Sequence, residues 1–204
     1  MKQTLTRCLL LVACYSAVIV PAQAAMVQVQ VQDEQGKALS DAVVFLESRE
    51  AKQVARPLQG AEIAQVGRQF IPSVLIVTTG TAVSFPNRDT VRHHVYSFSA
   101  TKKFELKLFA GTPTNPVVFD KSGIAVLGCN IHDNMAAWVV VVDTPFYARS
   151  NNLGLASVAD VPAGSYRLRV WHSRLPVGAP AADQAVAVGS SPGNATVRLT
   201  GLMP

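Results

Sequence analysis

The chain has 204 residues, a length that suits one large or two small domains and allows a real hydrophobic core. Its 18 Lys and Arg residues against 13 Asp and Glu residues give a net charge of +5, with no run of five or more like charges. Proteins that bind nucleic acid normally show a clustered basic stripe, so this composition argues against a nucleic-acid partner.

Residues 1–24 have the three parts of a secretory signal peptide. Lys2 and Arg7 supply the positive start, residues 8–20 the apolar middle, and the Ala-Gln-Ala sequence at 22–24 the cleavage site. The apolar run is too short for a normal membrane span, and no later stretch reaches about 20 uncharged apolar residues. We therefore expect export to a bacterial periplasm, with no membrane span in the mature protein.

Signal cleavage changes the cysteine inventory. Cys8 and Cys14 leave with the signal, so Cys129 is the single thiol of the mature chain. Residues 11–14 resemble a lipoprotein cleavage box, but residues 15–20 after it are still apolar, and lipid anchoring at Cys14 is not expected. An odd cysteine in an exported protein is an intermolecular pair, a reactive thiol or a ligand; the alternative is a buried, inert cysteine.

Two β-strands are predicted at the start of the mature chain, in residues 25–60. Val27, Val29 and Val31 alternate with glutamines, which is the period-two pattern of a half-buried strand. A turn at 33–36 separates them from a second strand at 42–46. The run VQVQDEQGKALSDAVVFLE resembles the start of a transthyretin-like or carboxypeptidase-regulatory-like β-sandwich. Residues 48–60 are polar with little periodicity, so we expect a linker or irregular loop.

Residues 61–142 are predicted to form a second group of strands. Apolar positions and turn residues place these strands near 74–76, 83–85, 95–98, 104–109, 117–119 and 124–127. The last of them runs directly into Cys129. After Met135 comes the run Trp138-Val-Val-Val-Val, and an uninterrupted apolar run suits a strand that is covered on both faces. We expect no amphipathic helix outside the signal.

The pattern of the first strands returns in residues 143–204. After a turn at 151–154, DVPAGSYRLRVWH contains an alternating strand at 165–171 and looks like the closing half of the same sandwich family. Residues 185–188 and 196–199 could supply the last two strands. We therefore predict one β-sandwich in two parts, 25–60 and 143–204, that flank an inserted domain at 61–142. The alternative is that the flanking strands simply extend one sheet.

Metal-donor side chains gather around Cys129. Two residues separate Cys129 from His132, and two more separate His132 from Met135. A thiolate, two imidazoles and a thioether are together the donor set of a blue-copper electron-transfer site. The alternatives are that His132 is a surface histidine and that Met135 fills the core, a use that methionine serves readily.

His93 and His94 compete to supply the second imidazole. Adjacent residues of a strand point to opposite faces, so only one of them is expected to face the metal. His93 lies two positions before Val95, on the face expected to point to the core, and we take it as the ligand with His94 as the alternative. Asn87 and Asn130 could form hydrogen bonds around the loop and the sulfur, which would tune the metal, or could serve only as turn residues.

The central segment resembles a cupredoxin. Asn87, His93 and Val95 match the plastocyanin and amicyanin pattern of Asn, five residues, His, one residue, Val, and the spacing from Cys129 to Met135 resembles that of amicyanin. FPNRDTVRHHVYSFS, KFELKLF and GIAVLGCNIHDNM are similar to exported bacterial proteins often labelled methylamine utilization proteins. His94 departs from this pattern, because simple cupredoxins commonly have Asn there, and the segment is short for a free-standing cupredoxin.

The resemblance implies an all-β chain, in which a cupredoxin-like Greek-key β-sandwich is inserted in or packed on a second small β-sandwich. It also implies one type 1 copper ion and single-electron transfer in the periplasm, rather than enzymatic catalysis. Cys129, His93 and His132 would be the strong ligands and Met135 the weak axial one. A redox protein such as a cytochrome or a periplasmic dehydrogenase is the expected partner.

Two other functions stay open at this point. The protein could bind copper for storage, delivery or sensing. Less favoured is a carbohydrate-binding module in the flanking strands, whose aromatic residues are Phe146, Tyr147, Tyr166 and Trp171. Structural zinc, which prefers closed Cys/His coordination, fits a Met donor poorly. A dithiol redox site lacks a second cysteine, and no group that would orient a Cys–His hydrolase pair stands out. His172 is interpreted as a surface residue.

Overall fold

The computed structural model describes residues 24–204. The expected signal peptide, apart from its last residue, and the lipid-anchoring alternative at Cys14 lie outside the described residues. Within residues 24–204, no helix is both long enough and apolar enough to cross a membrane.

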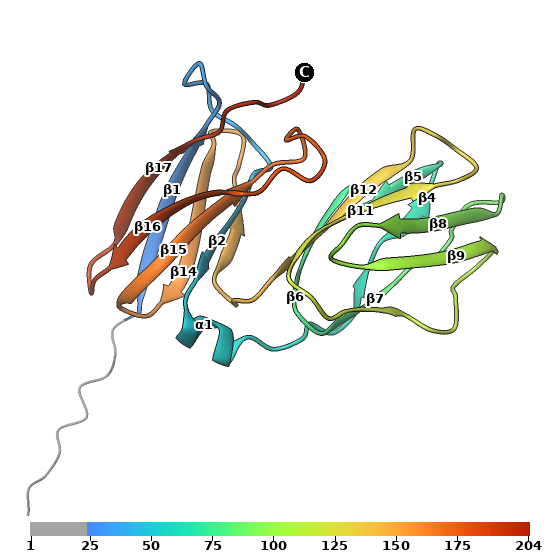
Figure 1. The fold of residues 1–204 in the computed structure, drawn as a ribbon, viewed down its shortest axis with the longest axis horizontal. Helices are drawn as coiled ribbons and strands as arrows, with labels where there is room; N and C mark the ends of the chain where they lie inside the picture. Colours follow the sequence, from blue (N-terminus) through green and yellow to red (C-terminus); the bar gives the residue numbers. More distant parts are fainter. Residues whose placement is uncertain (1–23) are drawn as a thin grey trace, which may run out of the picture.

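The described chain is all-β, as predicted, and forms two sandwiches side by side (Figure 1). The flanking sandwich consists of β1 (Ala25–Gln32), β2 (Val43–Glu47), β13 (Tyr147–Arg149), β14 (Leu155–Val161), β15 (Gly164–Trp171), β16 (Ala182–Val188) and β17 (Gly193–Arg198). The central sandwich consists of β3 (Ala61–Glu62), β4 (Ala64–Val66), β5 (Gln69–Ile71), β6 (Val74–Thr78), β7 (Thr81–Ser84), β8 (His93–Phe98), β9 (Lys103–Phe109), β10 (Val117–Phe119), β11 (Gly123–Cys129) and β12 (Ala136–Val142).

In the flanking sandwich, each sheet combines strands from both ends of the chain. One sheet has the order β14-β1-β17 and the other β13-β2-β15-β16. β1 therefore pairs antiparallel with β14 and parallel with β17. The alternating valines of β1 are buried in a core that also contains Leu168 and Val170 of β15. The predicted domain boundaries at 60/61 and 142/143 stay predictions; β3 begins at Ala61 and β12 ends at Val142.

The central sandwich places a five-stranded sheet, β6-β12-β11-β8-β9, opposite a three-stranded sheet, β10-β7-β3. The core between them includes Phe85, Phe119 and Leu127, and it also contains Cys129 and Met135. A separate hairpin, β4-β5, completes this part of the chain. The loop that carries the predicted metal donors thus begins and ends inside a packed core.

The valine run of β12 is buried on both faces, which confirms its prediction. Val139 and Val141 pack into the core of the central sandwich. Val140 and Val142 point the other way, into a second cluster with Phe45 of β2 and Trp171 of β15. Successive side chains of a strand alternate between faces, so covering both faces removes the usual polar alternation. The two sandwiches therefore share a hydrophobic interface built on β12.

Several elements differ from the sequence prediction: the short strands β3, β4, β5 and β13 were not predicted, and two further differences have a clear cause. The expected irregular loop contains a short helix, α1 (Arg49–Val54), because the Ser48 hydroxyl accepts a hydrogen bond from the Ala51 N–H at 3.0 Å and caps its first turn. β14 was not predicted, because small and polar residues weaken its alternation. A register shift against β1 occurs in this strand, and Asp160 there adopts a φ of 56°.

His172 is buried rather than exposed, which corrects the sequence interpretation. The residue follows β15, and its ring lies between two backbone groups. Nε2 lies 3.1 Å from the Ser40 carbonyl oxygen, and the Arg174 N–H donates to Nδ1 at 3.1 Å. Burial lowers the pKa of His172 below its ordinary value, despite the hydrogen bond to Ser40. The neutral ring is therefore the form that fits the folded protein.

We expect the metal-free protein to lose stability as the pH falls below about 6.5, the ordinary histidine pKa. The unfolded chain then takes up a proton at His172 that the folded chain binds only at lower pH. Urea denaturation at pH 7.5 and 5.5 measures this loss. His172→Asn should be less stable than the wild type at pH 7.5 but lose less on acidification. An equal loss in both proteins would show that His172 does not contribute.

Candidate metal centre

Cys129 is fixed by the sheet at the point where β11 ends. It pairs with Val95 of β8, and its side chain is 3% exposed. The preceding Gly128 pairs with Tyr96, and a Cβ atom on Gly128 would lie 2.7 Å from the Tyr96 ring. Glycine is therefore needed for the close approach of β8 and β11, which sets the position of the sulfur.

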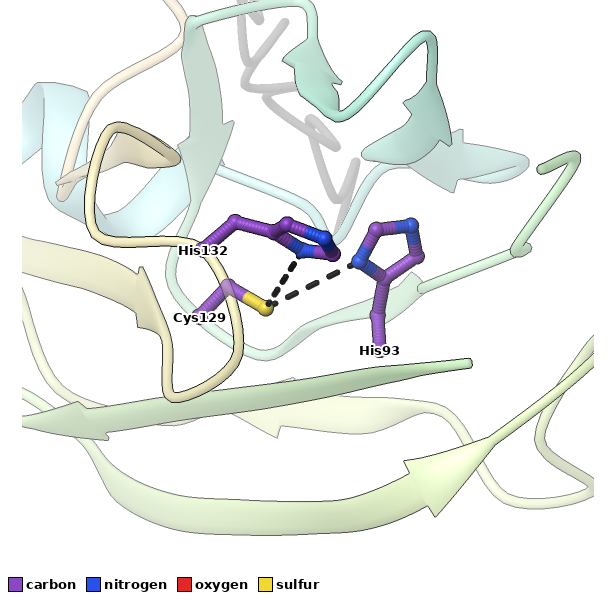
Figure 2. Close-up of side chains that lie close together, drawn as sticks. All are labelled: His93, Cys129 and His132. Carbon is purple, nitrogen blue, oxygen red and sulfur yellow. Dashed lines mark hydrogen bonds between the residues drawn. The ribbon is translucent and has the colours of Figure 1, made fainter. Parts of the chain in front are cut away.

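Two histidines approach this sulfur from different segments (Figure 2). His93, the first residue of β8, is fully buried, and its Nδ1 lies 3.7 Å from the Cys129 Sγ. His132 lies in the loop between β11 and β12, with its Nδ1 3.9 Å from the same sulfur. The three donor atoms all lie within 4.8 Å of one another. The loop is closed by a hydrogen bond from the Met135 N–H to the His132 carbonyl at 3.0 Å.

These separations fit a single metal ion between the three donors. Bonds of the lengths found at zinc, about 2.3 Å to sulfur and about 2.0–2.1 Å to nitrogen, would at a trigonal angle place sulfur and nitrogen about 3.8 Å apart. The observed distances of 3.7 and 3.9 Å lie on either side of that value. A thiolate with two imidazoles in trigonal array is the ligand set that suits copper in blue-copper sites. The residues present therefore fit a copper ion.

Asp89 is a part of the site that the sequence interpretation missed. Its Oδ2 lies 2.8 Å from the His93 Nε2, on the side of the ring away from Cys129. The backbone N–H groups of Gly67 and Arg68 also donate to the Asp89 carboxylate, at 2.6 and 2.9 Å. Burial raises the pKa of Asp89, but these backbone donors and the His93 ring outweigh it, so the pKa lies below the ordinary value.

The ionised carboxylate assigns the tautomer of His93. A carboxylate only accepts hydrogen bonds, so the Nε2 of His93 carries the proton and donates it to Asp89. In the neutral ring, the lone pair of Nδ1 is then free, and Nδ1 lies 3.7 Å from the sulfur. Ligating histidines usually have such a partner, so an acidic residue four positions before His93 was a usable signal. The contact with the β4–β5 turn was not, because nothing in the sequence places that turn beside residue 89.

The other predicted site residues lie around this group. His94 points away from Cys129 and pairs with Glu105 of β9 at 2.8 Å. Met135 is 2% exposed within the central core, and its role as axial ligand stays a prediction.

Asn87 accepts a hydrogen bond from the Asp89 N–H at 2.9 Å and donates to two backbone carbonyls, so it holds the loop that carries Asp89. Asn130 is exposed, and its N–H donates to the His94 carbonyl at 3.1 Å.

The aromatic residues considered for carbohydrate binding are partly used for packing. Tyr166 and Trp171 are 6% and 3% exposed, so they offer little face for stacking on a sugar. Phe146 and Tyr147 are partly buried and pack against the cores of the flanking sandwich and of the interface.

Comparison with known proteins gives matches of structure only. No protein-family model and no curated protein sequence matches the chain. A purple cupredoxin from Nitrosopumilus maritimus has a TM-score of 0.36 and 23% identity, over 40% of this chain and 99% of that one. A reduced Cu(I) form of an amicyanin variant has a TM-score of 0.37 and 18% identity, over 48% and 98%. A copper-containing nitrite reductase from Thermus scotoductus SA-01 has a TM-score of 0.38 and 22% identity, over 47% and 27%. The family named from the sequence therefore stays a resemblance.

Proposed function

We propose that the protein is a periplasmic mononuclear copper protein that carries single electrons between redox partners. The observation that carries this proposal is the convergence of one buried thiol and two imidazole nitrogens, at 3.7 and 3.9 Å from the sulfur. The signal-peptide pattern at residues 1–24 and the resemblance to exported methylamine utilization proteins support the compartment, without fixing the pathway.

In this proposal, Cys129, His93 and His132 hold the copper, and Met135 is the weak axial ligand. A copper ion bound there supplies one-electron oxidation and reduction. The residues keep the donor positions constant between the two redox states, since Cys129 and His93 are fixed by paired strands and are buried. No substrate bond is made or broken, so the protein is proposed to act as a carrier rather than an enzyme.

His132 is the proposed point at which electrons enter and leave. It is the one partly exposed side chain of the three donors, whereas His93 and Cys129 are buried. Its neighbour Ile131 is 48% exposed, which gives a partner an apolar contact beside the ring. A redox protein such as a cytochrome or a periplasmic dehydrogenase is the proposed partner, and close docking at His132 would shorten the path to the metal.

Copper loading of the purified wild-type protein tests this function. We expect Cu(II) to give an intense visible thiolate-to-copper band and the loaded protein to undergo reversible one-electron cycling in voltammetry. A protein that stays colourless, or that binds only Cu(I), would contradict the carrier and favour copper storage, delivery or sensing instead.

A further inference from the structure

Asp89 and His93 form a carboxylate–histidine pair, and the Asp89 carboxylate also accepts two backbone hydrogen bonds. His93 is fully buried, and the Asp89 side chain is 12% exposed. The N–H groups of Gly67 and Arg68 donate to the two carboxylate oxygens. Both of these turn residues have positive φ, 60° and 58°, the conformation of a tight hairpin turn, which directs two successive N–H groups toward the acid. The carboxylate is therefore fixed before any metal binds.

We propose that Asp89 is the positioning residue that selects the donor nitrogen of His93 and makes the metal site favour Cu(II) over Cu(I). This inference rests on the proposed function, because it concerns the same site. Its two parts, the tautomer and the charge, have separate physical causes and separate tests.

The first part concerns the tautomer. A neutral imidazole binds a metal through whichever nitrogen lacks the proton. Because Asp89 accepts the Nε2 proton, the nitrogen that faces Cys129 is held ready to bind, and the ring cannot turn without breaking that hydrogen bond. A carboxylate on a ligating histidine also raises the basicity of the ligand.

The second part concerns the charge. One thiolate leaves a Cu(II) centre with a charge of +1 and a Cu(I) centre with none. The ionised Asp89, whose side chain is 12% exposed, brings these totals to zero and −1. The carboxylate therefore stabilises the oxidised form relative to the reduced form and lowers the reduction potential.

The chain contains a matched control for this pair. His94, the next residue along β8, pairs with Glu105 at the same distance, 2.8 Å, on the opposite face of the strand. Glu105 is 43% exposed, and His94 is not among the three grouped donors. Removal of the Glu105 charge therefore removes an equivalent histidine–carboxylate pair that does not act on the metal.

The experiment compares wild type, Asp89→Asn, Asp89→Ala and Glu105→Gln, after circular dichroism has shown that each protein is folded. The Asn side chain still accepts from His93 but carries no charge, so Asp89→Asn should keep the visible band, lose about 10–100-fold in Cu(II) affinity and change little in Cu(I) affinity. Each tenfold difference between the two affinities raises the potential by about 59 mV. Asp89→Ala should also alter the spectrum, and Glu105→Gln should match the wild type.

Nitrogen NMR of the metal-free wild type tests the tautomer without copper. In the neutral ring we expect the His93 Nε2 to carry the proton. A neutral ring with its proton on Nδ1 would overturn the positioning role even if no variant folds. A blue wild type with an unchanged potential in Asp89→Asn would overturn the charge effect and leave the proposed function standing. A wild type that never turns blue would contradict the proposed function itself, while the NMR result would still decide the role of Asp89.

Discussion

Replacement of Cys129 by serine is expected to abolish the intense visible absorption of the copper-loaded protein. Serine keeps the side-chain size but supplies a hydroxyl that stays protonated, so no thiolate is available for charge transfer to copper. His93 and His132 remain, and weak Cu(II) binding should persist with an affinity loss larger than the roughly 10–100-fold typical of outer-shell partners. Absorption spectra and competition titrations of both proteins measure these two effects.

The variant His94→Gln is the control for this result. It changes a histidine that lies next to His93 in sequence but pairs with Glu105 instead of approaching the sulfur. The visible band should survive in His94→Gln and disappear in His93→Gln. Loss of the band in His94→Gln alone would show that the wrong histidine has been assigned.

The metal-free Cys129→Ser protein should stay folded. Its free energy of unfolding should fall by about 1–3 kcal/mol, because the hydroxyl is buried.

Truncation of Trp171 to alanine is expected to destabilise the metal-free protein by about 3–5 kcal/mol. Trp171 is 3% exposed in the interface cluster, where its ring centroid lies 6.3 Å from that of Trp138 on β12. The change leaves a cavity in the cluster that Trp171 shares with Val140, Val142 and Phe45. Domains have about 5–15 kcal/mol of stability in total, so the loss is large. Urea denaturation measures it.

Val177→Ala serves as the matched control for Trp171, because Val177 follows β15 as well but is 73% exposed. It should change the free energy of unfolding by less than about 0.5 kcal/mol. If Trp171→Ala costs no more than this control, the interface does not stabilise the protein and the two sandwiches are energetically independent.

The sequence predicted those parts of the fold that depend on local alternation or on spacing. Strands such as β1, β9 and β15 alternate clearly, and the valine run of β12 correctly indicated burial on both faces. The spacing from Cys129 to His132 indicated a metal loop, because donors so close in sequence can be brought together by one short loop without help from distant segments. Strand parity preferred His93, and the structure brings this residue to Cys129.

The parts that were missed depend on contacts between distant segments. Two N–H groups of the β4–β5 turn donate to Asp89 beside His93, and residues 67 and 68 lie 22 and 21 positions away from Asp89. His172 looked like a surface residue because the backbone groups that hold it, at Ser40 and Arg174, give no sequence signal. β14 was hidden because its irregular register with β1 disturbs the alternation.

The insertion of the central sandwich between β2 and β13 also sets the order in which the chain can fold as it emerges from its N-terminal end. β1 pairs with β14 and β17, and β2 pairs with β13 and β15. Neither has a partner until the whole central sandwich has emerged, because β14 begins at Leu155 and β13 at Tyr147. Such distant pairings form slowly and leave strand edges open in the meantime. The central strands have nearer partners, and all three metal donors precede β13. The protein can therefore form its metal loop before the flanking sandwich that packs against β12 has assembled. Until the flanking sandwich forms, β1 and β2 are the segments that need protection from aggregation.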